Sequence, residues 1–252
     1  MKTKRRMKYT GFFCLMVFAS FLAATVAAQT SLPDVGLITK LTGEATYGNK
    51  GDNQAPAKVR AFMKVRQGDH LKLPAAASLT LLYFASGRQE TWKGPVTFMA
   101  GDQESKVVGG KQPAPQPEVK IFPAKASKQM AGAPLPLPPA SMSKSGVIQT
   151  MGPKREPAAK TTAPLSSEAQ RKIKEAEKVY LDLKKSAAAD DVTPDLYFFS
   201  VLAEYKQYPE MAKMVDAMLQ KRPGDTALKD LKAWVRSQSA ARDLLFPQSH
   251  NQ

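Results

Sequence analysis

The sequence predicts an α+β protein of more than one domain, and three stretches of its 252 residues carry that prediction. Residues 31–110 alternate polar and apolar side chains between Gly and Asp turns, which is typical of an antiparallel β-sandwich or barrel-like domain. Residues 111–165 are rich in Pro, Ala and Lys, a composition that predicts a disordered linker. Residues 166–246 space apolar side chains at helical intervals and predict antiparallel helical hairpins, followed by a disordered tail at 247–252.

Residues 1–28 have the three parts of a secretory signal peptide. Five basic residues precede an apolar run over 11–26, and Val26-Ala27-Ala28 offers small side chains for cleavage before Gln29. The alternative is an uncleaved signal anchor in the inner membrane, because the run approaches the length that spans a bilayer. Export to the periplasm or cell envelope is the expected localisation.

Cleavage would change the chemistry of the chain. Its only cysteine, Cys14, lies in the apolar run, so the exported chain would carry no thiol for a disulfide, a metal or a covalent reaction. The formal charge is +15, and loss of five basic residues leaves about +10. Such a chain is attracted to anionic lipid, peptidoglycan carboxylates and acidic proteins, although solubility is the simpler explanation. No nucleic-acid partner is expected, because no basic recognition helix or aromatic stacking motif is recognisable.

The β domain is expected to open with a strand at 35–41 that ends at Gly43, with a hairpin partner at 44–47. Gln67-Gly68-Asp69 predicts a turn, because Gly accepts a positive φ and Asp bonds its own backbone. A short strand at 70–73 follows this turn.

The strongest predicted strand is 78–84. Both of its faces are largely apolar, which predicts a central position in a sheet. Ser86-Gly87 predicts a hairpin turn into 89–92, and Gly94-Pro95 predicts a second turn into 96–98. The two faces of the strong strand alternate as Leu79, Leu81 and Tyr83 against Thr80, Leu82 and Phe84.

These strands and turns resemble the FecR-like family over about residues 35–110. The resemblance rests on a glycine-bounded opening strand, the Gly68-Asp69 turn, the long apolar strand and its Gly87 hairpin, and the segment 94–98. It implies a β-rich domain on the outer side of the cytoplasmic membrane that serves protein contacts and signalling and has no catalytic role. Signal-transducing members carry a cytosolic anti-sigma segment before a membrane span. The apolar run here begins near residue 11, so anti-sigma signalling is not expected.

Two short apolar islands interrupt the Pro-rich segment, which otherwise predicts extended, partly polyproline II chain. They lie at 119–122 and 145–151, and each could add an edge strand to the β domain.

Four amphipathic helices are expected beyond residue 165. Ser167 with Gln170 fits a capping box at the first helix, and Thr193 followed by Pro194 predicts the start of the second. Pro209 begins the third, and Pro223-Gly224-Asp225 ends it and caps the fourth.

The stretch 197–219 with the following Pro-Gly-Asp break resembles tetratricopeptide-type helical hairpins. The resemblance implies a surface that binds a peptide or a protein. At most two units fit, whereas repeat arrays normally need three or more for stability. The helices are therefore expected to dock against the β domain, a partner or another copy.

The sequence carries no catalytic motif of the metalloprotease, serine-hydrolase or phosphate-loop kinds. Asp190-Asp191 is interpreted as a solvated helix end rather than a catalytic pair. No enzymatic activity, cofactor, metal or small-molecule substrate is expected. Trp92, Tyr197 and Tyr205 are the candidate residues for partner contact, and each is also explained as part of a core.

The predicted function is that of a non-catalytic, exported bacterial envelope protein that binds protein partners in a scaffold, assembly or sensing role. The alternative is a module that binds peptidoglycan or another anionic glycan through a basic surface.

Overall fold

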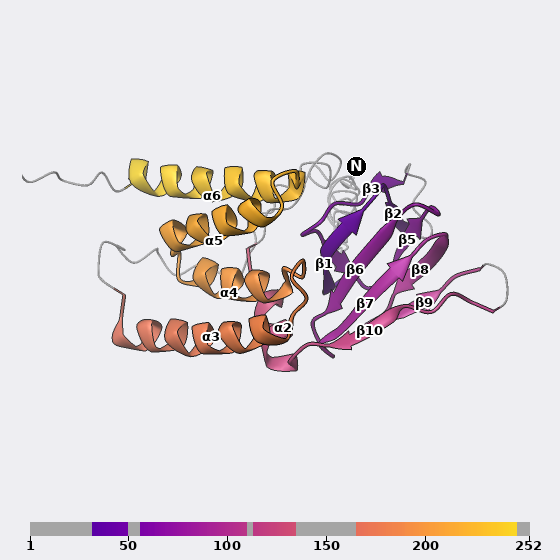
Figure 1. The fold of residues 1–252 in the computed structure, drawn as a ribbon, viewed down its shortest axis with the longest axis horizontal. Coiled ribbons are helices and arrows are strands. Elements are labelled where there is room, and N and C mark those ends of the chain that lie inside the picture. The colour runs from indigo at the N-terminus through magenta and orange to yellow at the C-terminus, as the bar shows by residue number, and fades with distance from the viewer. Residues whose placement is uncertain (1–31, 50–55, 110–112, 135–164, 246–252) are drawn as a thin grey trace, which may run out of the picture. The chain divides into compact units, whose positions relative to one another are not determined.

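The computed structural model describes residues 32–49, 56–109, 113–134 and 165–245. The predicted signal peptide, the island at 145–151, most of the predicted linker and the tail at 247–252 lie outside these residues. Within the described part, ten strands form two five-stranded antiparallel sheets and are followed by helices, so the α+β class is confirmed (Figure 1). None of the described helices is long and apolar enough to cross a membrane.

The first sheet, here sheet A, is built around the predicted central strand β6, which lies between β7 and β1. Its β6–β7 hairpin turns at Gly87, as predicted. The strands of sheet A, in spatial order, are β10 (Glu118–Ile121), β7 (Arg88–Lys93), β6 (Ser78–Tyr83), β1 (Asp34–Thr42) and β4 (Lys64–Arg66).

The second sheet, sheet B, packs on one face of sheet A through a shared core. Its strands, in spatial order, are β3 (Ala57–Lys58), β2 (Thr46–Asn49), β5 (Asp69–Leu73), β8 (Val96–Ala100) and β9 (Ser105–Val107). The larger buried side chains of this core are Ile38, Leu79, Leu81, Tyr83 and Trp92 from sheet A and Leu71, Leu73 and Phe98 from sheet B.

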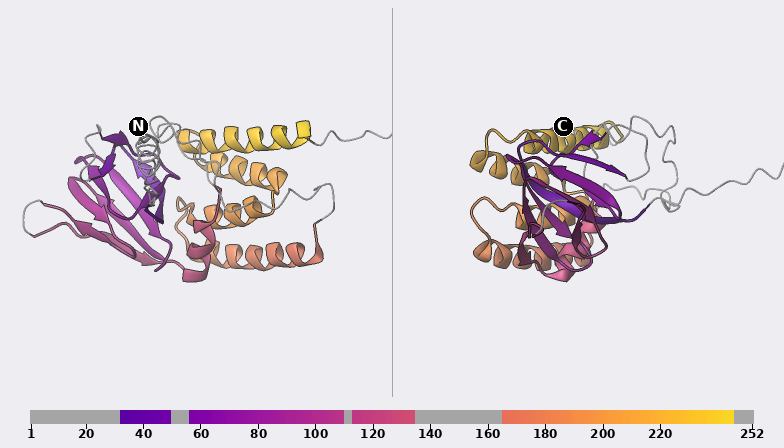
Figure 2. Two further views of the ribbon diagram at one scale, coloured as in Figure 1. Left: turned by 180° about the vertical axis from the view of Figure 1, so that it is seen from behind. Right: turned by 90° about the vertical axis from the view of Figure 1, so that its right-hand side faces the viewer.

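The other face of sheet A packs on helices, and the two form a second core. The helices are α2 (Ala124–Ala131), α3 (Ser167–Ser186), α4 (Thr193–Glu204), α5 (Tyr208–Lys221) and α6 (Thr226–Leu245). Each of α3 to α6 packs on the next, and Figure 2 shows them side by side in chain order. Docking on the β sheet, one of the three expected ways to complete the helical array, is present.

The second core explains why both faces of β6 are apolar. Leu82 is fully buried and reaches the helices, while Leu81 beside it points between the sheets. Polar contacts join the same two layers: Gln89 Nε2 donates to Thr193 Oγ1 at 2.9 Å, and Ser127 Oγ donates to the carbonyl of Phe84 at 2.9 Å. The predicted alternation of the strand is confirmed, and each of its faces has a different partner.

The Pro-rich segment is more ordered than its composition predicts. Its first island forms edge strand β10, which pairs with β7 as expected. Helix α2 follows and was not predicted. It contacts both β1 and α4, and its Met130 is fully buried in the second core. Tertiary burial, rather than intrinsic helix propensity, therefore holds this eight-residue helix.

Ser167 and Thr193 were the predicted caps of α3 and α4, and each prediction is wrong by one residue, because the cap residues are Ser166 and Val192. The cap of α3 is Ser166, whose hydroxyl accepts from the backbone N–H of Ala169. At α4, Thr193 makes no side-chain cap, and Asp191 accepts from its N–H instead. Asp225 does cap α6, because its carboxylate accepts from the N–H of Leu228 at 3.1 Å.

The shared core predicts that the sheets and helices unfold together. Leu82→Ala removes a fully buried side chain between them and is expected to lower the free energy of unfolding by about 2–5 kcal/mol, in a single transition. Urea unfolding followed by circular dichroism and by tryptophan fluorescence measures both quantities.

Leu181→Ala is the matched control, because Leu181 lies on α3 and is 52% exposed. Its effect is expected to stay within about 0.5 kcal/mol. Separate transitions for the two probes in the parent protein would contradict the coupling.

Candidate functional site

A groove of about 830 Å³ lies beside strand β10, at one edge of the two sheets. The β4–β5 turn, the β6–β7 turn, the β8–β9 hairpin and β10 supply its lining. The lining includes charges of both signs on Arg88, Glu104 and Lys106, together with the apolar side chain of Ile121. Surfaces of this mixed kind suit contact with a polypeptide.

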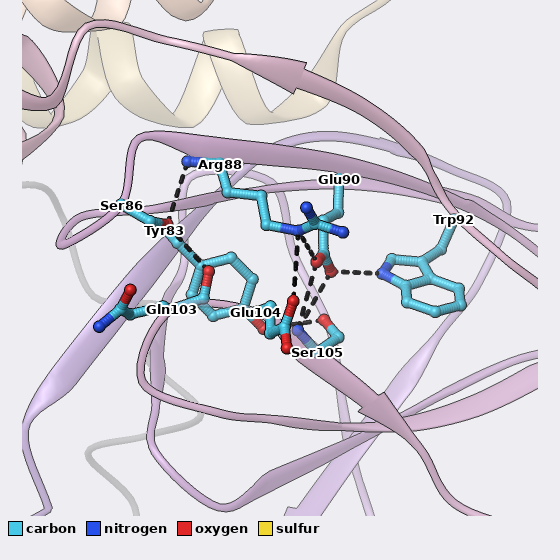
Figure 3. A network of polar contacts seen from close by, with 8 residues as sticks. All are labelled: Tyr83, Ser86, Arg88, Glu90, Trp92, Gln103, Glu104 and Ser105. Atoms are coloured by element: carbon cyan, nitrogen blue, oxygen red, sulfur yellow. Dashed lines mark hydrogen bonds and ion pairs between the residues drawn. The ribbon is translucent and has the colours of Figure 1, made fainter.

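A buried carboxylate, that of Glu90, lies behind this groove (Figure 3). Arg88, Glu90 and Trp92 alternate along β7, so their side chains lie on one face of the sheet. Arg88 Nε donates to Glu90 Oε1 at 2.6 Å, and Trp92 Nε1 donates to Oε2 at 3.0 Å. The N–H of Ser105 lies 3.3 Å from both oxygens. Each oxygen is thus compensated by donors, as a charge that is only 1% exposed requires.

The same network ties the two sheets together at the groove. The hydroxyl of Tyr83, on β6, lies 2.8 Å from Ser105 Oγ on β9. Ser86 Oγ, in the β6–β7 turn, donates to the carbonyl of Gln103 at 2.8 Å. Burial raises the pKa of the Tyr83 hydroxyl far above its usual range, although the Ser105 bond acts in the opposite direction. The groove therefore has a rigid base made of cross-sheet hydrogen bonds.

The edge strand β10 presents two apolar side chains beside this base. Val119 is 37% exposed and Ile121 is 73% exposed. They pair with Glu90 and Arg88, so they share the sheet face of those residues. The N–H of Phe122 donates to the carbonyl of Gly87, and backbone direction alternates along a strand. The N–H groups of Val119 and Ile121 consequently point away from β7, toward the open edge.

Gly87 makes the attachment of β10 possible. It has a φ of +69°, and a Cβ there would lie 2.0 Å from the carbonyl oxygen of Phe122. A side chain at this position would therefore push the edge strand away from the hairpin.

The three residues predicted for partner contact do not form one exposed surface. Trp92 is 2% exposed and stacks on Phe98 between the sheets, with ring centroids 4.8 Å apart. Tyr197 is 6% exposed in the second core, where burial raises the pKa of its hydroxyl, and Tyr205 packs half-buried against the same core. Trp92 is the only one of the three in the network behind the groove. The residues that sequence reasoning missed are Arg88, Glu90 and Ile121, although the alternation along β7 and the predicted edge strand pointed to their positions.

The acidic pair and the strand histidine have structural partners. Asp190 forms an ion pair of 2.5 Å with Lys40, and that contact lowers the pKa of Asp190. Asp191 accepts from the N–H of Thr193, and the Nδ1 atom of His70 lies 3.0 Å from the Gly68 carbonyl. Among the described residues, no group of three or more His, Cys, Asp or Glu side chains is placed to hold a metal ion.

Comparisons with known proteins identify no family for this chain. No protein-family model, no curated protein and no solved structure matches it significantly. Its function is therefore inferred from the residues and their geometry.

Replacement of Glu90 tests whether the network is the base of the groove. Glu90→Gln keeps the size of the side chain but leaves a single acceptor oxygen facing Arg88, Trp92 and Ser105. The free energy of unfolding is expected to fall by about 2–4 kcal/mol, because buried donors lose their acceptor. Urea unfolding measures the change.

Glu104→Gln is the matched control. The Glu104 carboxylate lies 4.0 Å from Arg88 and is 59% exposed, so its replacement is expected to change the free energy of unfolding by less than about 0.5 kcal/mol. Equal effects of the two variants would contradict the assignment.

The buried Tyr83 predicts a loss of stability at high pH. A tyrosine in the unfolded chain ionises at about pH 10. In the folded protein the raised pKa of Tyr83 keeps its hydroxyl protonated above that pH. The contribution of Tyr83 is therefore complete below about pH 10 and falls at higher pH by up to about 1.4 kcal/mol per pH unit. Tyr83→Phe removes this dependence. The difference in unfolding free energy between parent and variant is expected to be constant below about pH 9 and to narrow between about pH 10 and about pH 11, and a constant difference over the whole range would refute the explanation.

Proposed function

We propose that this protein is a non-catalytic, exported protein of the bacterial cell envelope that binds a protein partner by strand addition at β10. The observation that carries the proposal is the exposed Ile121 on an edge strand that borders the groove. Within the described residues, β10 pairs with β7 alone, so its other edge is open to a further strand.

Strand addition uses both features of this edge. The outward N–H groups of Val119 and Ile121 would bond the backbone of an extended peptide, which supplies affinity that is independent of sequence. Alternate side chains of that peptide would enter the groove and meet Ile121, Arg88 and Glu104, which supplies specificity. Because Glu90 and its donors hold Arg88 in place, little side-chain freedom is lost on binding.

The wider layout is compatible with this role. The resemblance of residues 35–110 to FecR-like domains favours protein contacts in the envelope, and the signal-like residues 1–28 favour export. The consecutive packing of α3 to α6 is compatible with tetratricopeptide-type hairpins. In the proposed protein these helices brace sheet A from behind and leave β10 free for the partner.

The open edge is tested by removal of a single N–H group. Ile121→Pro deletes an outward donor, and proline is tolerated on an edge strand where that donor faces solvent. Tagged full-length protein, chemically cross-linked in the source cells and analysed by mass spectrometry, is expected to capture a dominant envelope protein. The proline variant is expected to lose at least about tenfold of that capture, as loss of a backbone bond and of strand geometry implies.

Ile121→Thr is the matched control, because it keeps the N–H group and favours a strand. It is expected to retain more of the partner than the proline variant. Both variants must show the thermal unfolding midpoint of the parent to within a few degrees. Equal capture by the proline variant and the parent protein would overturn strand addition at β10.

A further inference from the structure

The outer face of sheet B carries a row of alternating lysine and threonine side chains. Strand pairing places Lys58 opposite Thr46, Thr46 opposite Lys72, and Lys72 opposite Thr97. The row therefore crosses β3, β2, β5 and β8. Its members point outward, because the next residues along β5 and β8, Leu71 and Phe98, pair in the core between the sheets.

A second row lies beside the first and adds one more lysine. Gly48, His70, Met99 and Lys106 follow one another across β2, β5, β8 and β9. None of the eight outward positions in the two rows is Asp or Glu. Within the described chain Lys72 and Lys106 form no ion pair, whereas Lys58 pairs with Glu44 at 2.9 Å on side chains that are 75% and 81% exposed. An ion pair this exposed contributes little and leaves Lys58 available.

Of the two regions 33–134 and 166–245, the first, which holds both sheets, carries the larger excess of positive charge. Residues 33–134 contain 14 Lys and Arg against 8 Asp and Glu, whereas residues 166–245 contain 14 against 13. The outer face of sheet A is covered by helices, so sheet B is the broad sheet face whose lysines meet solvent. A surface with an excess of lysines attracts a polyanion over a long range.

We propose that this face binds an anionic glycan, a linear polysaccharide with carboxylate groups that lies across the strands. Neighbouring strands are about 4.8 Å apart, so Lys58 and Lys72, two strands apart, offer cations about 10 Å apart along the row. The hydroxyls of Thr46 and Thr97 flank Lys72 and are placed to bond sugar hydroxyls. The eight positions include no Phe, Tyr or Trp ring on which a nucleobase could stack, and Met99 is their only large apolar side chain, which disfavours a lipid surface.

This site is separate from the proposed strand addition. Lys106 and Met99 also line the groove beside β10, so the test leaves them unchanged. The double variant Lys58→Gln/Lys72→Gln removes two charges from the row. Its matched control, Lys174→Gln/Lys178→Gln, removes two exposed charges from α3. A third variant, Thr46→Val/Thr97→Val, keeps every charge and suits strand positions.

The probe is polygalacturonate, with dextran as the neutral polysaccharide and vesicles of phosphatidylcholine and phosphatidylglycerol as the anionic lipid. The full-length protein is expected to bind polygalacturonate and not dextran, with affinity that falls as salt rises from about 50 to about 300 mM. The row variant is expected to bind at least about fivefold more weakly, the α3 control to stay within about twofold, and the threonine variant to bind about two- to fivefold more weakly.

Three results would overturn the inference. The first is that the parent protein does not bind polygalacturonate. The second is that the row variant and the α3 control lose affinity equally, and the third is that the parent binds the vesicles more tightly than the polysaccharide. None of them bears on partner capture at Ile121, so this inference and strand addition can fail independently.

Discussion

The structure depends on the burial of strand β6 on both of its faces. Leu81 lies between the two sheets and Leu82 lies against the helices, and both are fully buried. An antiparallel sheet that is apolar on both faces cannot leave either one in water. Sheet B covers one face, and α2 with the helical array covers the other. The helices therefore belong to the core of the β-rich part.

This arrangement decides which surfaces remain for partners. With both faces of sheet A covered, the surfaces that the described β-rich part keeps include the outer face of sheet B and the edge at β10. The two differ in chemistry, because the face carries lysine and threonine whereas the edge carries Ile121 beside a rigid guanidinium–carboxylate pair. Under the two proposals together, the protein holds two kinds of ligand, a polypeptide at the edge and an anionic glycan at the face.

The sequence predicted what local patterns encode and missed what depends on distant partners. The two-faced strand β6, its Gly87 turn and edge strand β10 follow from alternation and turn chemistry. Helix α2 was missed because proline-rich flanks dominate the composition, while its stability comes from burial of Met130. Trp92 was assigned to a contact surface because one aromatic residue on a strand does not reveal which face is covered. Alternation along β7 places Arg88, Glu90 and Trp92 on one face, but the burial of Glu90 could not be predicted, since it depends on the packing of sheet B and on the Ser105 N–H of β9.

The exposed apolar edge is itself an argument for a partner. An open edge strand with apolar side chains is a template for unwanted pairing, and proteins usually protect such edges with charges. Strand β10 has that protection in part, since Glu118 and Lys120 alternate with Val119 and Ile121. The charged residues lie on the opposite sheet face from the groove, whereas the apolar ones lie on the groove side, where Arg88 and Glu90 are already fixed. Protection is thus missing where a bound strand would place its side chains, which is the pattern expected when a partner covers that side.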